Sequence, residues 1–208
     1  MPSVTAMAVT DPPALWEDLG FAVEGGTCHI GSVRVDLGAT PPEGASTGIA
    51  WWTLSGLGGP ADLDGLPTRL VDGDGPPDPA SASHPNGAVA IDHIVVSSPR
   101  FERTVELLQD AGLLLRRRRS PDGARPMSMA FFRIGETILE VVEAGGDGPP
   151  RFWGLAITVG DIEATAALLG DRLRPVRPAL QPGRSIATVD RACGSSVELA
   201  FMSQPGTA

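Results

Sequence analysis

The feature that most constrains this chain is an internal repeat, because residues 90–108 return in altered form at 152–169. An ungapped alignment with an offset of 61 positions (154 − 93 and 169 − 108) places Gly154 on His93 and Leu169 on Leu108. Further along, residues 130–143 correspond to residues 187–201, so each copy ends in two strands, the last of which carries a carboxylate. The repeated unit is therefore predicted to be a strand, a helix and three more strands (βαβββ), and such a repeat determines the architecture before any single motif does.

Each copy opens with the pattern of a strand that turns into a helix. In the first copy, the apolar run around Ile94 carries His93 and ends at Ser98, after which apolar residues recur at helical spacing. Ser98 is predicted to cap this helix and Pro99 to occupy its first position, where the missing N–H would have no partner anyway.

The N-terminal part of the chain contains a weaker copy of the unit. Residues 4–37 repeat the strand, the break and the helix, but Ala6 stands where the first full copy has His93. Residues 48–55 and 65–71 are predicted to form two further strands, which we interpret as a truncated fourth unit without a helix.

A stretch rich in Pro, Gly, Asp and Ser separates this part from the two full copies and is predicted to be a linker. We therefore expect an α+β protein in which tandem βαβββ modules form a curved mixed sheet around a cavity. Its expected parts are a degenerate N-terminal module (1–72), a linker (73–87) and a domain (88–203) built from modules 88–144 and 151–203.

Composition excludes several classes of function. The formal net charge of −9 and the pI near 4.7 argue against nucleic acid or an anionic membrane as partner, since both require a basic face. No apolar run approaches the roughly 20 residues that cross a bilayer, and the N-terminus lacks the pattern of a secretory signal. Cys28 and Cys193 lie far apart without metal-site spacing, which favours a cytoplasmic protein; a homodimer is left open.

Charged residues inside apolar strands are the candidates for a functional site. A buried carboxylate without a partner is costly, and a divalent metal ion held by His93, Glu140 and Glu198 would remove that cost. The alternatives are a core histidine and rim carboxylates paired with Arg133 or Arg184. Because alternate residues of a strand share a face, the predicted cavity lining is Val95, Ile138, Val142, Gly154, Ala156, Thr158, Ala200 and Met202.

Arginines offer a second, weaker signal. Four of them are consecutive at 116–119 in a predicted strand, so at most two can face a pocket. A solvated, charge-protected edge is the simpler interpretation, and a rim that steers a carboxylate or phosphate substrate is the other. Arg184 follows a tight turn and is expected to face solvent, with a ligand as the alternative.

These tandem units, with DHIVV opening the first and VEL closing the second, resemble the vicinal oxygen chelate superfamily of glyoxalases, bleomycin resistance proteins and extradiol dioxygenases. The resemblance covers residues 89–202 well and 4–37 weakly. It implies two units folded around one cavity and, in the metalloenzymes, one ligand from the first and one from the last strand of each unit. The matching positions here are His93, Glu140, Gly154 and Glu198, and Gly154 has no side chain to offer.

Two functions follow from this resemblance. The first is glyoxalase- or bleomycin-resistance-like binding of a small molecule in the cavity, with an incomplete metal site. The second is a metal-dependent enzyme of lyase, isomerase or dioxygenase type, in which the metal polarises a substrate oxygen while Glu140 or Glu198 moves a proton. No other cofactor is expected. A further interpretation gives the N-terminal module a role in dimerisation or in covering the cavity.

Overall fold

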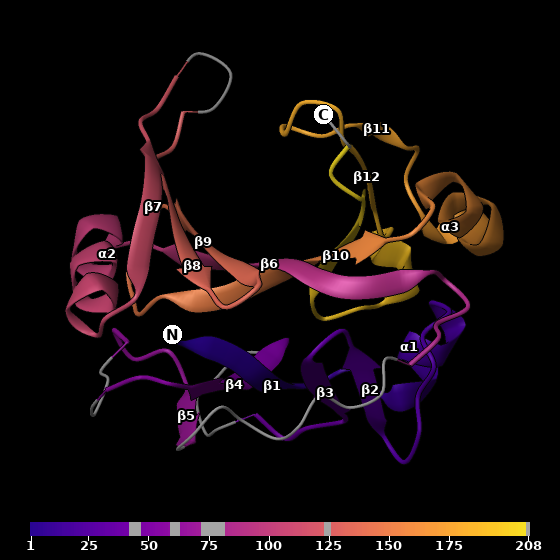
Figure 1. Ribbon diagram of the computed structural model, residues 1–208, viewed down its shortest axis with the longest axis horizontal. Helices are drawn as coiled ribbons and strands as arrows, with labels where there is room; N and C mark the ends of the chain where they lie inside the picture. The colour runs from indigo at the N-terminus through magenta and orange to yellow at the C-terminus, as the bar shows by residue number, and fades with distance from the viewer. Residues whose placement is uncertain (42–46, 59–62, 72–81, 123–125, 207–208) are drawn as a thin grey trace.

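The computed structural model describes residues 1–41, 47–58, 63–71, 82–122 and 126–206, so residues 73–81 of the predicted linker lie outside the described part. These residues form two β-sheets and three α-helices (Figure 1). The elements are β1 (Ser3–Val9), α1 (Pro13–Asp18), β2 (Thr27–Ile30), β3 (Val33–Leu37), β4 (Ile49–Ser55), β5 (Thr68–Val71), β6 (Ala88–Ser98), α2 (Phe101–Asp110), β7 (Leu114–Arg119), β8 (Met129–Ile134), β9 (Thr137–Glu143), β10 (Arg151–Val159), α3 (Ile162–Leu169), β11 (Arg177–Pro178), β12 (Ser185–Thr188) and β13 (Glu198–Ser203), with short 3-10 helices at Gly170–Arg172 and Arg191–Cys193.

The larger sheet consists of two βαβββ modules side by side, as the repeat predicts. Its strand order is β11-β12-β13-β10-β6-β9-β8-β7. The first strands of the modules, β6 and β10, pair antiparallel at the centre, and each pairs parallel with the last strand of its own module, β9 or β13. In Figure 1 the two outer halves rise on either side of β6 and β10, so the sheet is curved and has a concave face. The α+β prediction with tandem modules is confirmed.

The N-terminal sheet is a reduced version of the same arrangement. Its order is β2-β3-β1-β4-β5, in which β1 pairs parallel with β3 and antiparallel with β4. β5 pairs parallel with β4, as β13 does with β10. The strands β4 and β5 therefore occupy the places of a fourth unit, and residues 56–58 and 63–67 between them, as far as the structure describes this segment, form no helix or strand.

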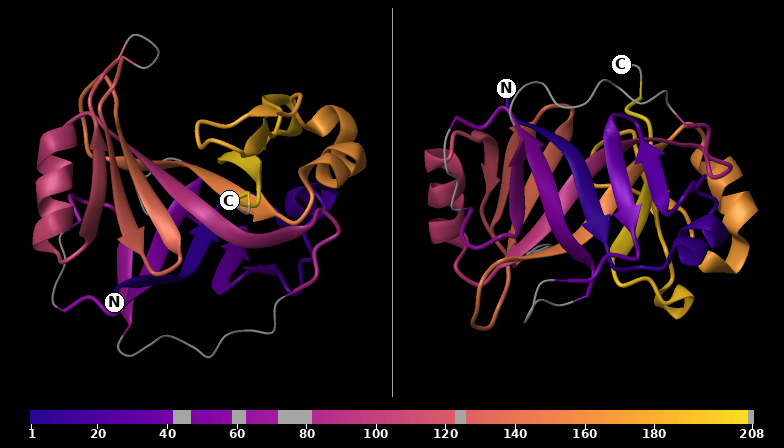
Figure 2. Two further views of the ribbon diagram at one scale, coloured as in Figure 1. Left: turned by 45° about the horizontal axis from the view of Figure 1, so that its top comes forward. Right: turned by 90° about the horizontal axis from the view of Figure 1, so that it is seen from below.

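The two sheets pack against each other through apolar side chains. The rings of Trp52 and Phe152 lie 5.2 Å apart, and those of Phe21 and Phe201 lie 5.8 Å apart. Along β6 the face that contributes to this core carries Ile94, which is 1% exposed, and His93 faces the other way. The N-terminal sheet therefore covers the convex face between α2 and α3 and leaves the His93 face open (Figures 1 and 2).

Two buried carboxylates join the N-terminal part to the larger sheet. Asp11 is 2% exposed and accepts hydrogen bonds from the indole of Trp16, the hydroxyl of Ser195 and both the backbone N–H and the hydroxyl of Ser196. Asp64, at 4% exposed, accepts from Arg103 and from the hydroxyl of Thr104 in α2. Such buried, multiply bonded carboxylates hold the two parts in one orientation.

Helix α2 begins later than the sequence predicts. Its N-cap is Arg100 and its first residue is Phe101, whereas Ser98 and Pro99 were predicted to be the cap and the first position. Ser98 is instead the last residue of β6, where it pairs with Glu143. Its hydroxyl bonds to Thr104 at 2.7 Å and accepts from the N–H of Arg100, so it fixes the turn between strand and helix.

None of the helices in the described ranges has the length and apolar composition needed to cross a membrane.

Candidate functional site

Asp92 and His93 both project from the concave face because β6 contains a β-bulge. Ala156 of β10 lies opposite His93, and the next residue, Ile157, lies opposite Ile91, so Asp92 is the extra residue on β6. Ile91 and Ile94 are both in the core, at 4% and 1% exposed. The two residues between them therefore share the other face, although they are consecutive in sequence.

Asp92 is the centre of a polar network on this face. Its Oδ1 lies 2.9 Å from Nδ1 of His93, and its Oδ2 accepts from Nη2 of Arg184 at 2.6 Å and from the hydroxyl of Thr158 at 3.1 Å. Arg184 also donates through Nε to the carbonyl oxygen of Ser203. The sequence signalled neither Asp92 as a site residue nor its pairing with Arg184.

The arginine of this network is almost completely covered. The side chain of Arg184 is 8% exposed, so the expectation that it faces solvent is wrong. The turn at Gly183 returns the chain towards β13, and the carboxylate of Asp92 supplies the countercharge that a buried guanidinium needs. Because this countercharge comes from another module, no local pattern around Arg184 could predict it.

The network fixes the charge of Asp92 and the orientation of His93. Burial alone would raise the pKa of Asp92, but the hydrogen bonds from His93 and Arg184 and the nearby positive charge lower this pKa to about 2. The ionised carboxylate holds Nδ1 of His93, and Nε2 of the same ring lies 3.7 Å from Oε2 of Glu140. That distance is too long for a hydrogen bond. His93 and Glu140 are therefore brought together, each 14% exposed at the side chain.

The third predicted metal ligand is engaged elsewhere. Glu198 on β13 pairs with Arg191 at 2.5 Å, not with the predicted Arg133 or Arg184, and β10 and β6 separate its strand from β9. Across the described ranges, no group of three or more His, Cys, Asp or Glu side chains is placed to hold a metal ion. The donors present do not fit the predicted three-ligand site, because only His93 and Glu140 converge.

Gly154, the fourth matching position, is glycine for a steric reason. A Cβ built on it would lie 2.6 Å from the carbonyl oxygen and 3.2 Å from the Cβ of Glu198, its partner on β13. Contacts this short do not occur for real side chains, so a residue larger than glycine would displace β13. The position could not carry a ligand without moving that strand.

Strand register places the predicted lining residues on the face of His93. Opposed residues in a ladder point to the same side of the sheet, and Thr158, which contacts Asp92, shows which side this is. The pairs are Thr158 with Met202, Ala156 with His93 and Ala200, Gly154 with Val95 and Glu198, Ile138 with His93, and Val142 with Ser97. That these residues line a ligand cavity stays a prediction.

The four consecutive arginines lie on β7, which is an edge strand of the larger sheet. Arg118 is turned towards α2, where it pairs with Glu102 at 2.7 Å. Arg117 lies opposite Phe131, which in turn lies opposite Glu140, so Arg117 belongs to the concave face. Arg119 lies opposite Met129 on the same side and pairs with Asp122. Arg117 and Arg119 therefore face inward, and Arg116 is the extra residue where the register shifts.

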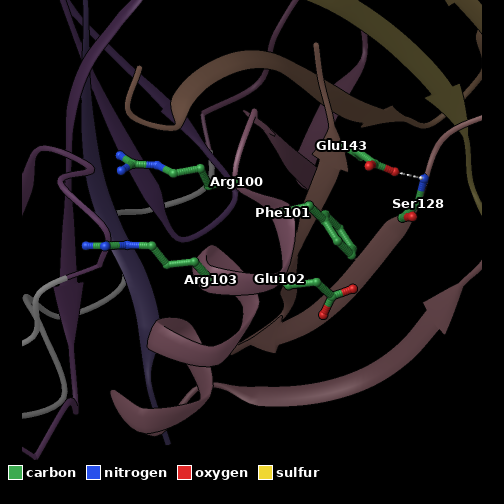
Figure 3. Close-up of a pocket in the computed structure, with 6 residues that line it drawn as sticks. All are labelled: Arg100, Phe101, Glu102, Arg103, Ser128 and Glu143. Carbon is green, nitrogen blue, oxygen red and sulfur yellow. Dashed lines mark hydrogen bonds between the residues drawn. The ribbon is translucent and has the colours of Figure 1, made fainter. Parts of the chain in front are cut away.

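Two hollows occur away from this network. One, of about 340 Å³, lies at the start of α2 (Figure 3). There Arg100 and Arg103 extend away from Glu143, which is occupied by the N–H of Ser128. The other, of about 550 Å³, lies between α1 and α3. Neither contains the His93 group, and the first brings together charges of both signs.

Comparison with solved structures shows what this arrangement is similar to. A xylose isomerase-like TIM barrel/4-hydroxyphenylpyruvate dioxygenase fusion protein superimposes over 99% of this chain and 49% of its own, with a TM-score of 0.68 and 14% identity. Methylmalonyl-CoA epimerase from Mycobacterium tuberculosis covers 58% of this chain and 91% of its own, with a TM-score of 0.48 and 13% identity. No protein-family model and no curated protein matches the sequence. At these identities the likeness shows the fold alone, and the chain spans about half of the fusion protein.

Proposed function

We propose that this chain, which has the fold of the vicinal oxygen chelate superfamily, binds a small molecule on the concave face of its larger sheet, next to His93. The supporting observation is the polar network of Asp92, His93 and Arg184 in the middle of apolar strands, with side chains only 8–16% exposed. Burying charged groups costs free energy. A polar ligand that binds to these groups would explain why they are present here. The role is that of a binding protein whose metal site is incomplete.

The network prepares His93 to recognise a ligand. In the tautomer that donates Nδ1–H to Asp92, the imidazole presents the lone pair of Nε2, which makes no hydrogen bond within the described part of the chain. A ligand hydroxyl or other donor can bind there, next to the carboxylate of Glu140. The same geometry would let His93 accept a proton from a bound substrate.

The test is a thermal-shift screen of small metabolites on the wild type, His93→Ala and the control Arg34→Gln, which changes an exposed residue of the N-terminal sheet. A ligand at 100 times its Kd stabilises a protein by about 2.7 kcal/mol. The proposal expects compounds that raise the Tm of the wild type and of Arg34→Gln but not of His93→Ala. Compounds that stabilise all three proteins equally would show binding elsewhere.

A metal-dependent lyase, isomerase or dioxygenase is the second candidate. One observation favours it: a carboxylate that holds Nδ1 while Nε2 faces another acid is the usual way in which metal-binding histidines are oriented. Metal analysis of protein purified without added metal decides between the two. Stoichiometric metal that is lost in His93→Ala supports the enzyme. No metal, and an unchanged Tm after addition of Ni²⁺, Zn²⁺ or Mn²⁺, supports the metal-free binder.

We place this activity in the cytoplasm. Cys28 and Cys193 are both free thiols, and burial raises the pKa of Cys28 to about 12, which keeps that thiol protonated and unreactive. Unpaired cysteines are typical of proteins from a reducing compartment.

A further inference from the structure

The outer strands of the first module add cations to the face of His93. Arg133 of β8 lies opposite Ile138 of β9, which lies opposite His93. Arg117 of β7 lies opposite Phe131, which lies opposite Glu140. Because opposed residues in a ladder share a face, both arginines project to the side of His93 and Glu140.

The curvature of the sheet brings these positions within reach of one small molecule. β8 is the second strand from β6, so the backbones of Arg133 and His93 are separated by two strand spacings, about 10 Å. Figures 1 and 2 show β7, β8 and β9 rising as a wall beside β6. Arg117 and Arg133 therefore lie on this wall, on the same face of the sheet as His93.

These two arginines differ from Arg118 and Arg119 in their ion pairing. Arg118 and Arg119 pair with Glu102 and Asp122, but Arg117 and Arg133 have no ion-pair partner among the residues that the structure describes. Both are exposed, in a chain whose net charge is −9. Between Arg117 and Glu140 lies the half-buried ring of Phe131. The concave face thus carries two arginines, then the ring of Phe131, and then Glu140 and His93.

We propose that the ligand of this face is a small organic anion whose carboxylate or phosphate group is bound by Arg117 and Arg133. Its apolar middle lies on Phe131 and its polar end reaches His93. Guanidinium groups form charge-assisted, often bidentate hydrogen bonds with both anionic groups, which makes them stronger than neutral ones. This inference rests on the proposed function and assigns the ligand's chemical class.

The experiment compares two anionic probes with a neutral one. The sodium salts of 4-hydroxybenzoate and 4-hydroxyphenyl phosphate, and neutral 4-hydroxybenzyl alcohol, are titrated by NMR and calorimetry into the wild type, Arg117→Gln/Arg133→Gln, Arg118→Gln and His93→Ala. Arg118→Gln is the matched control, since this residue lies on the same strand but faces α2. The proposal expects both anions, or the one whose group matches the site, to bind the wild type. The double variant weakens that binding at least about tenfold, whereas Arg118→Gln leaves it unchanged.

The outcomes separate this inference from the proposed function. Binding that His93→Ala abolishes but the double arginine variant retains would overturn the anion assignment and keep the site. Failure of both anions to bind the wild type would also overturn it, as would equal weakening in Arg118→Gln, which would indicate only a general charge effect. Binding that depends on the arginines but not on His93 would place the anion site apart from His93 and contradict the proposed function. Because Arg117 and Arg133 are exposed, we expect the variants to fold, which circular dichroism checks.

Discussion

Asp92 and His93 are consecutive in sequence, yet they project from the same face of β6, with Oδ1 of the carboxylate 2.9 Å from Nδ1 of the ring. A regular strand would place them on opposite faces, and the bulge is what brings them together. The other oxygen of this carboxylate, Oδ2, lies 2.6 Å from Nη2 of Arg184, which is 92 positions later in the sequence (184 − 92). One backbone irregularity thus connects the two modules at the candidate site.

The ionised Asp92 should stabilise the fold in a pH-dependent way. Its pKa in the folded protein is about 2, below the ordinary 3.8, so its contribution is present above about pH 4 and is lost as the pH falls from 4 towards 2. The lowering corresponds to a contribution on the order of 2 kcal/mol. Urea unfolding at pH 7, 5, 4 and 3 should show Asp92→Asn less stable than the wild type at pH 7, with the difference shrinking below pH 4. A difference that stays constant down to pH 3 would contradict this explanation.

His84 should make the protein less stable in mild acid. Its Nδ1 accepts from the N–H of Ala22 at 3.0 Å, and its Nε2 bonds the carbonyl oxygen of His29 at 2.7 Å. Only the neutral ring can do both, and burial, the largest cause, lowers the pKa of His84 below 6.5. The unfolded chain therefore binds a proton that the folded protein does not, and stability decreases as the pH falls below about 6.5. Melting curves at pH 8, 6.5 and 5.5 should show a steeper loss for the wild type than for His84→Gln; parallel losses would mean that another group is responsible.

Adding one methyl group at Gly154 should destabilise the protein. The new Cβ would lie 2.6 Å from the carbonyl oxygen of Glu198, a backbone atom that moves only if β13 moves. We expect Gly154→Ala to cost about 1–3 kcal/mol in urea unfolding, as overpacking of a well-packed site does. Gly145→Ala is the control, because no atom lies within 4 Å of the added Cβ there. Equal stability of the two variants would show that the strands separate more easily than this contact implies.

Asp11 should be one of the most sensitive polar positions outside the candidate site. Asp11→Ala leaves the indole N–H of Trp16 and the donors of Ser195 and Ser196 without their acceptor in a buried place. Each buried donor left without an acceptor costs at most about 1–3 kcal/mol. We therefore expect Asp11→Ala to lower the free energy of unfolding in urea by several kcal/mol. Ser196→Ala, which removes one of the donors to Asp11 and the hydroxyl contact with Thr10, should cost less. A larger effect for Ser196→Ala than for Asp11→Ala would contradict the central role of this carboxylate.

The sequence predicted the modules well because an internal repeat in the sequence directly indicates a repeated structural unit. The offset between His93 and Gly154 identified the two first strands, which indeed pair at the centre of the sheet, and the resemblance to the vicinal oxygen chelate superfamily is confirmed at the level of fold. In the structure Glu140 lies beside His93, and the role of the two residues as metal ligands stays a prediction.

The site itself was only partly predictable. Strict alternation would place Asp92 on the face opposite to His93, and the bulge shows itself only in Ile91 and Ile94, two core residues three positions apart. The partners of Arg184 and Glu198 depend on which segments meet in space, and a strand pattern does not contain that information. The strand pattern likewise could not predict that the N-terminal sheet packs on the convex face.

The central claim, that the concave face around His93 binds a small molecule, is tested most directly by mapping a bound compound on the amide NMR spectrum of the wild type. The compound is one that passes the thermal-shift comparison with His93→Ala. We predict shift changes confined to residues 91–97, 138–142 and 154–158 and to Arg117, Phe131, Arg133 and Arg184. Changes around Arg100 and Phe101 at the start of α2, or between α1 and α3, with none on β6, would contradict it.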